Sequence, residues 1–197
     1  MLAMEKAIYV TGITGFIGRN LLIHLLDRFE KVINFTRRDT FQIFEKENIQ
    51  EDDITSDFIQ KNPSKSLINL ATLYQPYPKT DLELKNLIEA NVLFPSRTID
   101  SLRSIKDLKI INASSYHQLL DFSNQNIYSL SKELLKRYLE HLNQNLLNIY
   151  IFDTFGAGDT RNKVTDTFIR NILNRKDIKI PQNDIYINLC DSEAIST

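Results

Sequence analysis

The chain has 197 residues, of which 42% are hydrophobic and 25% are charged, and its formal net charge is −1. These values are typical of a soluble globular protein with one domain or slightly more. A chain without a surplus of Lys and Arg cannot neutralise many phosphates, so we expect no nucleic acid and no membrane among its partners. The single cysteine, Cys190, excludes an intrachain disulfide and a cysteine-ligated metal cluster, which favours a cytoplasmic protein without a metal site.

Short apolar runs with the character of strands alternate with longer segments that have helical spacing. In chain order we expect strands at Lys6–Thr11, Lys31–Thr36, Asn48–Asp52, Ser66–Ala71, Leu108–Ala113 and Leu147–Phe152. Helices are expected at Gly15–Phe29, Leu82–Leu102 and Tyr128–Leu142, with a kink or an interruption at Pro95 in the second. This alternation predicts an α/β fold with a doubly wound parallel sheet, the Rossmann fold.

Three of the five glycines lie in one loop, at positions 12, 15 and 18, where the first strand turns into the first helix. With this spacing, the first glycine permits a tight turn, the second lets the backbone approach a pyrophosphate, and the third lets the helix lie close to the strand. We therefore predict a dinucleotide site, and a purely structural turn is the alternative. The loop residues expected to contact the cofactor are Gly12, Thr14, Gly15, Phe16, Ile17 and Gly18.

The second strand ends at Thr36, Arg37 and Arg38, where folds that prefer NAD usually carry an acidic residue for the ribose 2′-hydroxyl. Two guanidinium groups suit paired hydrogen bonds to a 2′-phosphate instead, so NADP(H) is the favoured cofactor and NAD(H) the second choice. The alternative is a solvated basic turn. Asp53 and Ile54, after the third strand, are candidates to flank the adenine, although an Asp before a helix is often a cap.

Tyr128 and Lys132 are spaced i, i+4 and therefore share one face of a helix, while Ser115 follows the fifth strand at the sheet edge where ligands bind. Reduction of a ketone needs a proton delivered to its oxygen, and a tyrosine hydroxyl can give it. A nearby ammonium lowers the pKa of the phenol and can hold the nicotinamide ribose, and a serine hydroxyl can hold the carbonyl. We predict that Ser115, Tyr128 and Lys132 are catalytic, and a chance pair on an amphipathic helix is the alternative.

Together, the Thr-Gly-x-x-Gly-x-x-Gly loop, the serine and the Tyr-x-x-x-Lys pair resemble the extended short-chain dehydrogenase/reductase family, also called NAD-dependent epimerase/dehydratases. The resemblance covers nearly the whole chain. It implies that the end of the fourth strand lines the cofactor, that a helix asparagine braces the active site, and that the segment after the sixth strand meets the nicotinamide and the substrate. The cofactor residues that it adds are Leu70, Ala71, Thr72, Asn91 and Phe155, and the substrate residues are Ser115, Tyr116, Asp153, Arg161 and Lys163.

Within the family, the chain is most similar to the nucleotide-sugar 4-ketoreductases of the CDP-abequose synthase group, in residues 112–118 and 152–163. Tyr116 and His117 stand where 4,6-dehydratases carry the Asp-Glu pair for water elimination. The resemblance therefore implies NADPH-dependent reduction of a 4-keto-6-deoxyhexose on a nucleotide. Arg161 and Lys163 are then at the substrate diphosphate or, alternatively, are two surface charges. A nucleotide-sugar epimerase that retains its dinucleotide and a non-catalytic NADP-binding sensor or scaffold are the alternative functions.

The chains of this family are longer than the present one. We expect residues 1–160 to form the dinucleotide-binding Rossmann domain and residues 161–197 to begin a substrate-binding portion whose larger part is absent. A domain without that portion is expected to bind cofactor but to turn over its substrate weakly or not at all. The resemblance also implies that a homodimer can form through the helices at 82–102 and 128–145, which are rich in leucine here.

Overall fold

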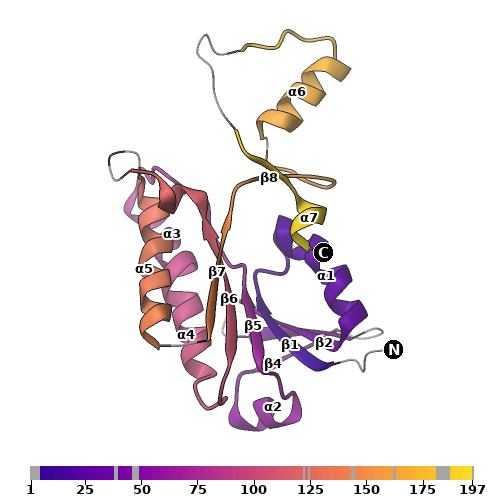
Figure 1. The fold of residues 1–197 in the computed structure, drawn as a ribbon, viewed down its shortest axis with the longest axis vertical. Coiled ribbons are helices and arrows are strands. Elements are labelled where there is room, and N and C mark those ends of the chain that lie inside the picture. Colours follow the sequence, from indigo (N-terminus) through magenta and orange to yellow (C-terminus); the bar gives the residue numbers. More distant parts are fainter. Residues whose placement is uncertain are drawn as a thin grey trace.

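A mixed sheet lies at the centre of the fold, with helices on both of its faces (Figure 1). The computed structural model describes residues 5–37, 40–45, 49–121, 123, 125–142, 145–161, 163–180 and 187–196. In this part of the chain the sheet has seven strands, in the order β4-β3-β2-β1-β5-β6-β7. Their bounds are β1 Glu5–Thr11, β2 Phe29–Phe35, β3 Thr40–Glu45, β4 Ile49–Asp53, β5 Ser66–Asn69, β6 Lys109–Ser115 and β7 Leu146–Ile151.

Strands β2, β1, β5, β6 and β7 are parallel neighbours, which confirms the predicted α/β fold with a doubly wound parallel sheet. The third predicted strand, Asn48–Asp52, exists as β4, but its expected place among the parallel strands is wrong. It pairs antiparallel with β3, for which the sequence analysis has no strand, and β3 pairs antiparallel with β2. The connections at 36–39 and 46–48 are too short for a parallel crossover, so these strands can join the sheet only as hairpins at its edge.

Alternate side chains of β1 enter two different cores, as the two-residue period of a strand requires. Ala7 and Tyr9 face one core, and Ile8 and Val10 face the other. The first core lies under α4 (Phe94–Ser101) and α5 (Ile127–Leu142), and the second lies under α1 (Phe16–Arg28). The first core also contains Phe35, Phe58, Leu67, Ile99, Leu102, Ile110, Leu135 and Leu139, and the second contains Ile13, Leu25, Val32 and Ile68.

The single helix expected at Leu82–Leu102 is three consecutive segments: α3 (Asp81–Ile88), a π-helical turn at Glu89–Leu93, and α4. At the end of the π turn the N–H of Phe94 donates to the carbonyl of Glu89, five residues earlier. Pro95 has no N–H to donate, so the expected interruption takes the form of a wider turn just before the proline. This turn carries the buried Asn91, which belongs to the site described below.

After β7 the chain forms β8 (Asp153–Phe155), which pairs in parallel with β9 (Leu189–Asp191). The short helix α7 (Ser192–Ser196) follows β9 and packs against α1, whereas α6 (Val164–Leu173) has no buried residue and projects from the rest of the fold (Figure 1). The remaining short helix, α2 (Ser56–Lys61), begins after β4. The division of the chain at residue 160 stays a prediction.

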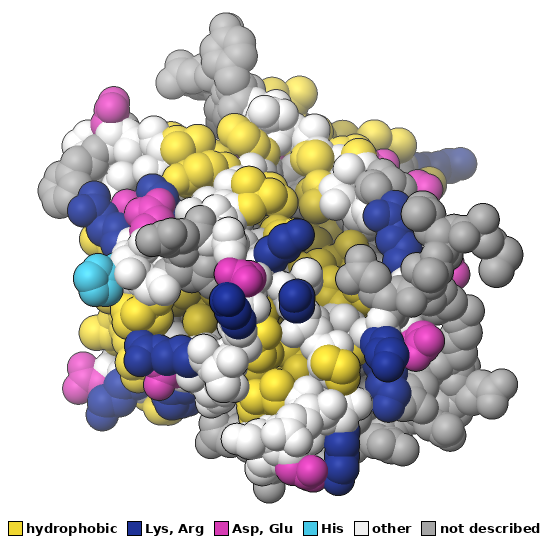
Figure 2. Space-filling view, turned by 60° about the horizontal axis from the view of Figure 1, so that its bottom comes forward, with side chains coloured by type: hydrophobic (Ala, Val, Ile, Leu, Met, Phe, Trp, Pro, Cys, Tyr) yellow, Lys and Arg dark blue, Asp and Glu magenta, His cyan; other side chains and the backbone are white. Residues whose placement is uncertain are grey.

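The surface mixes charges of both signs with apolar side chains. On the face shown in Figure 2, Lys and Arg are interspersed with Asp, Glu and hydrophobic groups, in keeping with the net charge near zero. Leu84 on α3 and Leu130 and Leu134 on α5 are exposed, and the homodimer through these helices stays a prediction. Among the residues described, no helix is both long enough and apolar enough to cross a bilayer.

The packing of α1 on the end of β1 leads to a first prediction. A Cβ added at Gly18 would lie 2.5 Å from the carbonyl oxygen of Gly12 and from the backbone of Ile13, so Gly18→Ala must displace backbone. We expect this substitution to lower the free energy of unfolding by about 3 kcal/mol. Gly15→Ala is the matched control: its Cβ would lie 3.2 Å from one carbonyl oxygen, and we expect a loss of about 1 kcal/mol. Urea unfolding measures both values, and equal losses would contradict the prediction.

Candidate active site

Two adjoining cavities lie where the carboxyl ends of β1, β5, β6 and β7 meet, which is the edge at which open α/β sheets bind ligands. The first cavity has a volume of about 810 Å³ and the second about 610 Å³. They share a wall, because five residues line both of them. These are Ile17, Leu70, Thr72, Tyr74 and Arg161.

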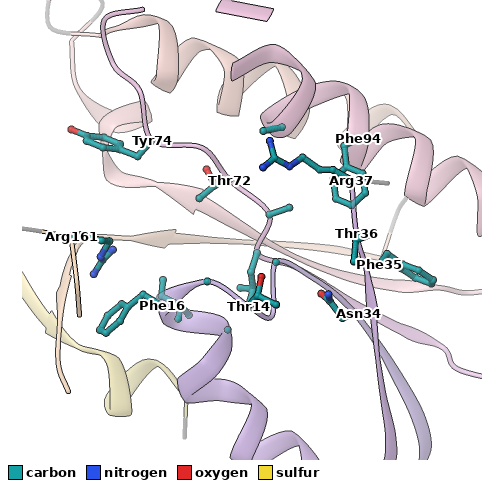
Figure 3. A pocket seen from close by; sticks show the side chains of 17 residues that line it. Thr14, Phe16, Asn34, Phe35, Thr36, Arg37, Thr72, Tyr74, Phe94 and Arg161 are labelled. Carbon is teal, nitrogen blue, oxygen red and sulfur yellow. The ribbon is translucent and has the colours of Figure 1, made fainter. Parts of the chain in front are cut away.

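The first cavity gathers most of the predicted cofactor residues (Figure 3). It is lined by all six predicted residues of the glycine loop, by two from the end of β2 and by three from the segment after β5. These are Gly12, Thr14, Gly15, Phe16, Ile17, Gly18, Thr36, Arg37, Leu70, Ala71 and Thr72. Of the others, Arg38 lies outside the described residues, as does the side chain of Asp53.

The glycine loop is shaped by backbone contacts that leave no room for a side chain at Gly12 or Gly18. Gly12 has a φ of +74°, and a Cβ there would lie 2.7 Å from the amide nitrogen of Ala71. The N–H of Gly15 donates to the carbonyl of Gly12 at 3.0 Å, and Gly15 directly precedes Phe16, the first residue of α1. The first amides of α1 therefore lie at the cavity without partners inside the helix, which suits them to an anion.

Asn34 is a cavity residue that the sequence analysis missed. Its side chain is buried near the end of β2, and its Oδ1 accepts the N–H of Ile13 at 3.1 Å. Strand β2 thereby supports the turn that follows Gly12. A polar residue within the apolar run Val32–Phe35, between Ile33 and Phe35, was the signal that could have found it.

Three of the described residues that were predicted to contact the cofactor line neither cavity: Asn91, Ile54 and Phe155. Ile54 packs against the first core, after β4, which is the outermost strand with β3 between it and β2. Its placement at the adenine stays a prediction. Phe155 is half-buried in β8 and is not among the lining residues.

A row of polar side chains crosses four parallel strands next to the site. Thr11, Asn69, Asn112 and Asn148 are register partners on β1, β5, β6 and β7. Thr11 Oγ1 donates to Asn69 Oδ1 at 2.6 Å, and Asn69 Nδ2 donates to Asn112 Oδ1 at 2.8 Å. Asn112 Nδ2 then donates to Asn148 Oδ1 at 2.8 Å. Because buried polar groups are costly without partners, this row favours one relative placement of the four strands.

The three predicted catalytic residues meet at the second cavity. Ser115 is the last residue of β6, and Tyr128 and Lys132 lie one turn apart near the start of α5. The side chains of Ser115 and Thr72 lie close enough to the Tyr128 hydroxyl to lower its pKa. A phenol, an alcohol and an amine therefore share one cavity beside the glycine loop.

Burial decides the acidity of both residues on α5. It raises the pKa of Tyr128, and the side chains of Ser115 and Thr72 offset that shift only in part. It lowers the pKa of Lys132 to about 8, because this side chain is 2% exposed and its ammonium loses hydration. Desolvation of the phenol dominates, so the net shift of the Tyr128 pKa is upward and not the lowering expected from a nearby ammonium; the contribution of Lys132 to it stays a prediction.

Asn91 braces the site and lines neither cavity. From the π turn, its Nδ2 donates to the carbonyl of Leu73 at 3.1 Å and to Ser131 Oγ at 3.0 Å. Its Oδ1 accepts the N–H of Leu73 at 2.7 Å. These bonds join the segment after β5 to the residue next to Lys132 on α5, so Asn91 acts on the site through its neighbours and not by direct contact.

Ser115 is held by a capping box that the sequence analysis missed. Gln118 Oε1 accepts the N–H of Ser115 at 2.8 Å, and Ser115 Oγ accepts the N–H of His117 at 3.3 Å. Gln118 Nε2 also donates to Glu133 on α5 at 3.1 Å. The end of β6 is thereby fixed to the helix that carries Tyr128. The Ser-x-x-Gln spacing of residues 115–118 was the available signal.

Aromatic rings form one wall of the second cavity. Tyr116 stacks on Phe152 with ring centroids 5.4 Å apart and on His117 at 4.2 Å. Tyr74 meets Tyr128 edge to face at 4.9 Å. Such rings offer apolar faces with polar edges. Tyr116 was predicted as a substrate residue, whereas nothing in the sequence around Tyr74 singled it out.

Two ion pairs complete the cavity walls. Asp153 and Lys163 lie 3.4 Å apart at the second cavity, and Arg161 pairs with Asp159 at 2.7 Å. All five predicted substrate residues line the second cavity: Ser115, Tyr116, Asp153, Arg161 and Lys163.

Comparisons with known proteins give the family. Residues 8–185 match the model of the NAD dependent epimerase/dehydratase family. The chain is 23% identical over 194 residues to the CDP-abequose synthase of Yersinia pseudotuberculosis, covering 92% of this chain and 68% of that relative.

Several solved structures share the fold. The dTDP-4-dehydrorhamnose reductase of Bacillus anthracis, in complex with NADP, matches with a TM-score of 0.67 and 16% identity, over 90% of this chain and 64% of that one. The UDP-N-acetylglucosamine 4-epimerase of Methanobrevibacter ruminantium, in complex with UDP-N-acetylmuramic acid, matches with a TM-score of 0.71 and 18% identity, over 98% and 71%. The chain thus spans about two thirds of the length of these proteins.

The buried ammonium of Lys132 predicts a pH-dependent stability. Its pKa falls from 10.5 to about 8 on folding, so the fold bears the cost of a buried charge below pH 8 and loses that cost as the pH rises from 8 toward 10.5. Lys132→Met removes the charge and keeps a side chain of similar shape. We expect the variant to be more stable at pH 7 by on the order of 3 kcal/mol, with the gap closing toward pH 10.

Urea unfolding of both chains in steps from pH 7 to pH 10 measures this gap. The ionisation of Tyr128 occurs in both chains and cancels in the difference. A gap that stays constant over this range would contradict the lowered pKa of Lys132.

Proposed function

The chain belongs to the NAD dependent epimerase/dehydratase family, and from that premise we propose that it uses NADPH to reduce a 4-keto-6-deoxyhexose carried on a nucleotide. The observation that carries the proposal is the shared wall of the two cavities. A dinucleotide in the first cavity would end beside Ser115, Tyr128 and Lys132 in the second. The similarity to CDP-abequose synthases supports the substrate class.

The choice of NADPH over NADH rests on Arg37. Its guanidinium points into the first cavity from the end of β2 (Figure 3), and Thr36 stands beside it instead of a carboxylate. An acidic side chain there would repel a 2′-phosphate, whereas a guanidinium can pair with one.

The chemistry assigned to the protein is proton delivery and orientation. A bound nicotinamide would supply hydride to the carbonyl carbon of the sugar. Ser115 Oγ holds the carbonyl oxygen, and the Tyr128 hydroxyl gives that oxygen its proton, so the ketone becomes an alcohol. The pKa of Tyr128, which burial raises from 10.0, leaves the phenol protonated at neutral pH, as a proton donor requires. Lys132, buried beside Tyr128, stabilises the phenolate left after the transfer and holds the nicotinamide ribose.

An epimerase that retains its dinucleotide is the second candidate, because the matched family includes epimerases and the same three residues serve hydride transfer in either direction. The two candidate functions differ in how much NADPH they consume. A reductase consumes one NADPH for each sugar, and an epimerase consumes none.

Tyr128→Phe tests the proposed proton donor. We expect turnover to fall by at least about 100-fold with NADPH affinity nearly unchanged, since only the hydroxyl is lost. Oxidation of NADPH is followed spectroscopically with a panel of nucleoside diphosphate 4-keto-6-deoxyhexoses, at enzyme concentrations equal to NADPH so that a single slow turnover is visible. Tyr138→Phe, on the same helix but packed against the first core, is the matched control. Retained activity in Tyr128→Phe would remove Tyr128 as the donor.

Arg37→Ala combined with Arg38→Ala tests the 2′-phosphate site. We expect NADPH to bind at least about tenfold more weakly and NADH to bind as before, because only NADPH carries the extra phosphate. Fluorescence titration measures both affinities. The control is Arg103→Ala combined with Lys106→Ala. It removes two cations that precede β6, at the amino ends of the strands and away from the cavities. Equal losses for NADPH and NADH would refute the assignment.

A further inference from the structure

Arg161 stands at the junction of the two cavities and lines both. Its guanidinium carbon lies 4.3 Å from the ring centroid of Phe16, the first residue of α1. The Phe16 side chain is buried in this position. Arg161 therefore covers the very residue whose amide begins the helix at the glycine loop. Arg37 lies at the other end of the first cavity (Figure 3).

The guanidinium of Arg161 is fixed along one edge. Its Nε and Nη2 donate to the two carboxylate oxygens of Asp159, both at 2.7 Å. Nη2 also donates to the carbonyl and the hydroxyl of Thr154 on β8, at 3.1 Å and 2.9 Å. The Arg161 guanidinium in turn holds the pKa of Asp159 below its usual value, so the carboxylate stays charged. Among the described residues, none accepts a hydrogen bond from Nη1, which keeps two N–H donors available.

We infer that Nη1 of Arg161 donates to the diphosphate of the bound dinucleotide, which makes Arg161 a cofactor ligand and not the substrate ligand that the family resemblance implied. The inference rests on the proposed function. The diphosphate belongs at the first amides of α1, and Arg161 is stacked on Phe16 at that point. A planar donor group already oriented by Asp159 loses little freedom when it meets a phosphate.

This placement couples the two cavities. Arg161 belongs to the segment that also contributes Asp153 and Lys163 to the second cavity. A cofactor that holds Arg161 would also hold this segment, and so would order the wall of the substrate cavity before the sugar arrives.

The test compares three variants of the full chain. Arg161→Met removes the donors but keeps an apolar stem over Phe16, and Arg161→Lys keeps the charge without the planar group. Arg170→Met is the matched control, because Arg170 pairs with Asp166 on α6 and lines neither cavity. Affinities for NADPH and NADH come from fluorescence titration, and hydrogen exchange of residues 153–161 is followed with and without NADPH.

We expect Arg161→Met to weaken NADPH and NADH by the same factor, about tenfold, because both carry the diphosphate. Arg161→Lys should lose less affinity for both nucleotides, and Arg170→Met should bind both with the affinity of the wild type. NADPH should slow exchange of residues 153–161 in the wild type and in Arg170→Met but not in Arg161→Met. If Arg161→Met does not fold, as thermal unfolding will show, a loss in Arg161→Lys for both nucleotides carries the same meaning.

Three results would overturn the inference. Wild-type affinity in both Arg161 variants would show that Arg161 does not touch the cofactor. A loss confined to NADPH would place Arg161 at the 2′-phosphate. A wild-type chain that binds neither nucleotide would overturn the proposed function itself, and the inference with it.

Discussion

A close backbone contact joins the end of β1 to the end of β5, and the site is built around it. The N–H of Leu70 donates to the carbonyl of Thr11 at 3.0 Å, and the N–H of Ala71 donates to Thr11 Oγ1 at 3.1 Å. Gly12 lies so near Ala71 that any Cβ would overlap its backbone. Because β1 and β5 are held together here, the glycine loop opens toward the segment after β5, and the first cavity forms between the two.

The active site contains buried polar groups that would be hydrated in the unfolded chain. The lost hydration of each is compensated in a different way. Asn69 and Asn112 satisfy one another across the sheet, and Asn91 is satisfied by the backbone of Leu73 and by Ser131. For Lys132, loss of hydration is the only cause of the shift, and burial therefore lowers its pKa to about 8. The cost of holding that amine in the fold is consistent with a role in chemistry and not in stability.

The two cavities share a wall drawn from distant parts of the chain. Ile17 comes from the start of α1, Thr72 and Tyr74 from the segment after β5, and Arg161 from the segment after β8. A ligand that binds in one cavity therefore contacts residues that also line the other cavity. This arrangement suits a reaction in which a cofactor and a substrate must touch.

The sequence by itself determined the type of fold, the place of the glycine loop and the identity of the three residues at the second cavity. These rest on local rules: the spacing of glycines 12, 15 and 18, the i, i+4 placement of Tyr128 and Lys132, and the apolar runs that form parallel strands. The hairpin of β3 and β4 was missed although β3, with Phe41 and Ile43 alternating with polar residues, has the character of a strand.

Only the tertiary structure decided which residues from distant parts of the chain come together at the site. Asn34, Tyr74 and Gln118 became site residues because strands and helices far apart in sequence placed them there. The structure also placed Ile54 against the first core, after β4 at the outer edge of the sheet. The pKa values of Tyr128 and Lys132 also depend on the tertiary structure. Spacing brings the two side chains to one face of α5, but burial, which depends on all the surrounding elements, sets the pKa of each.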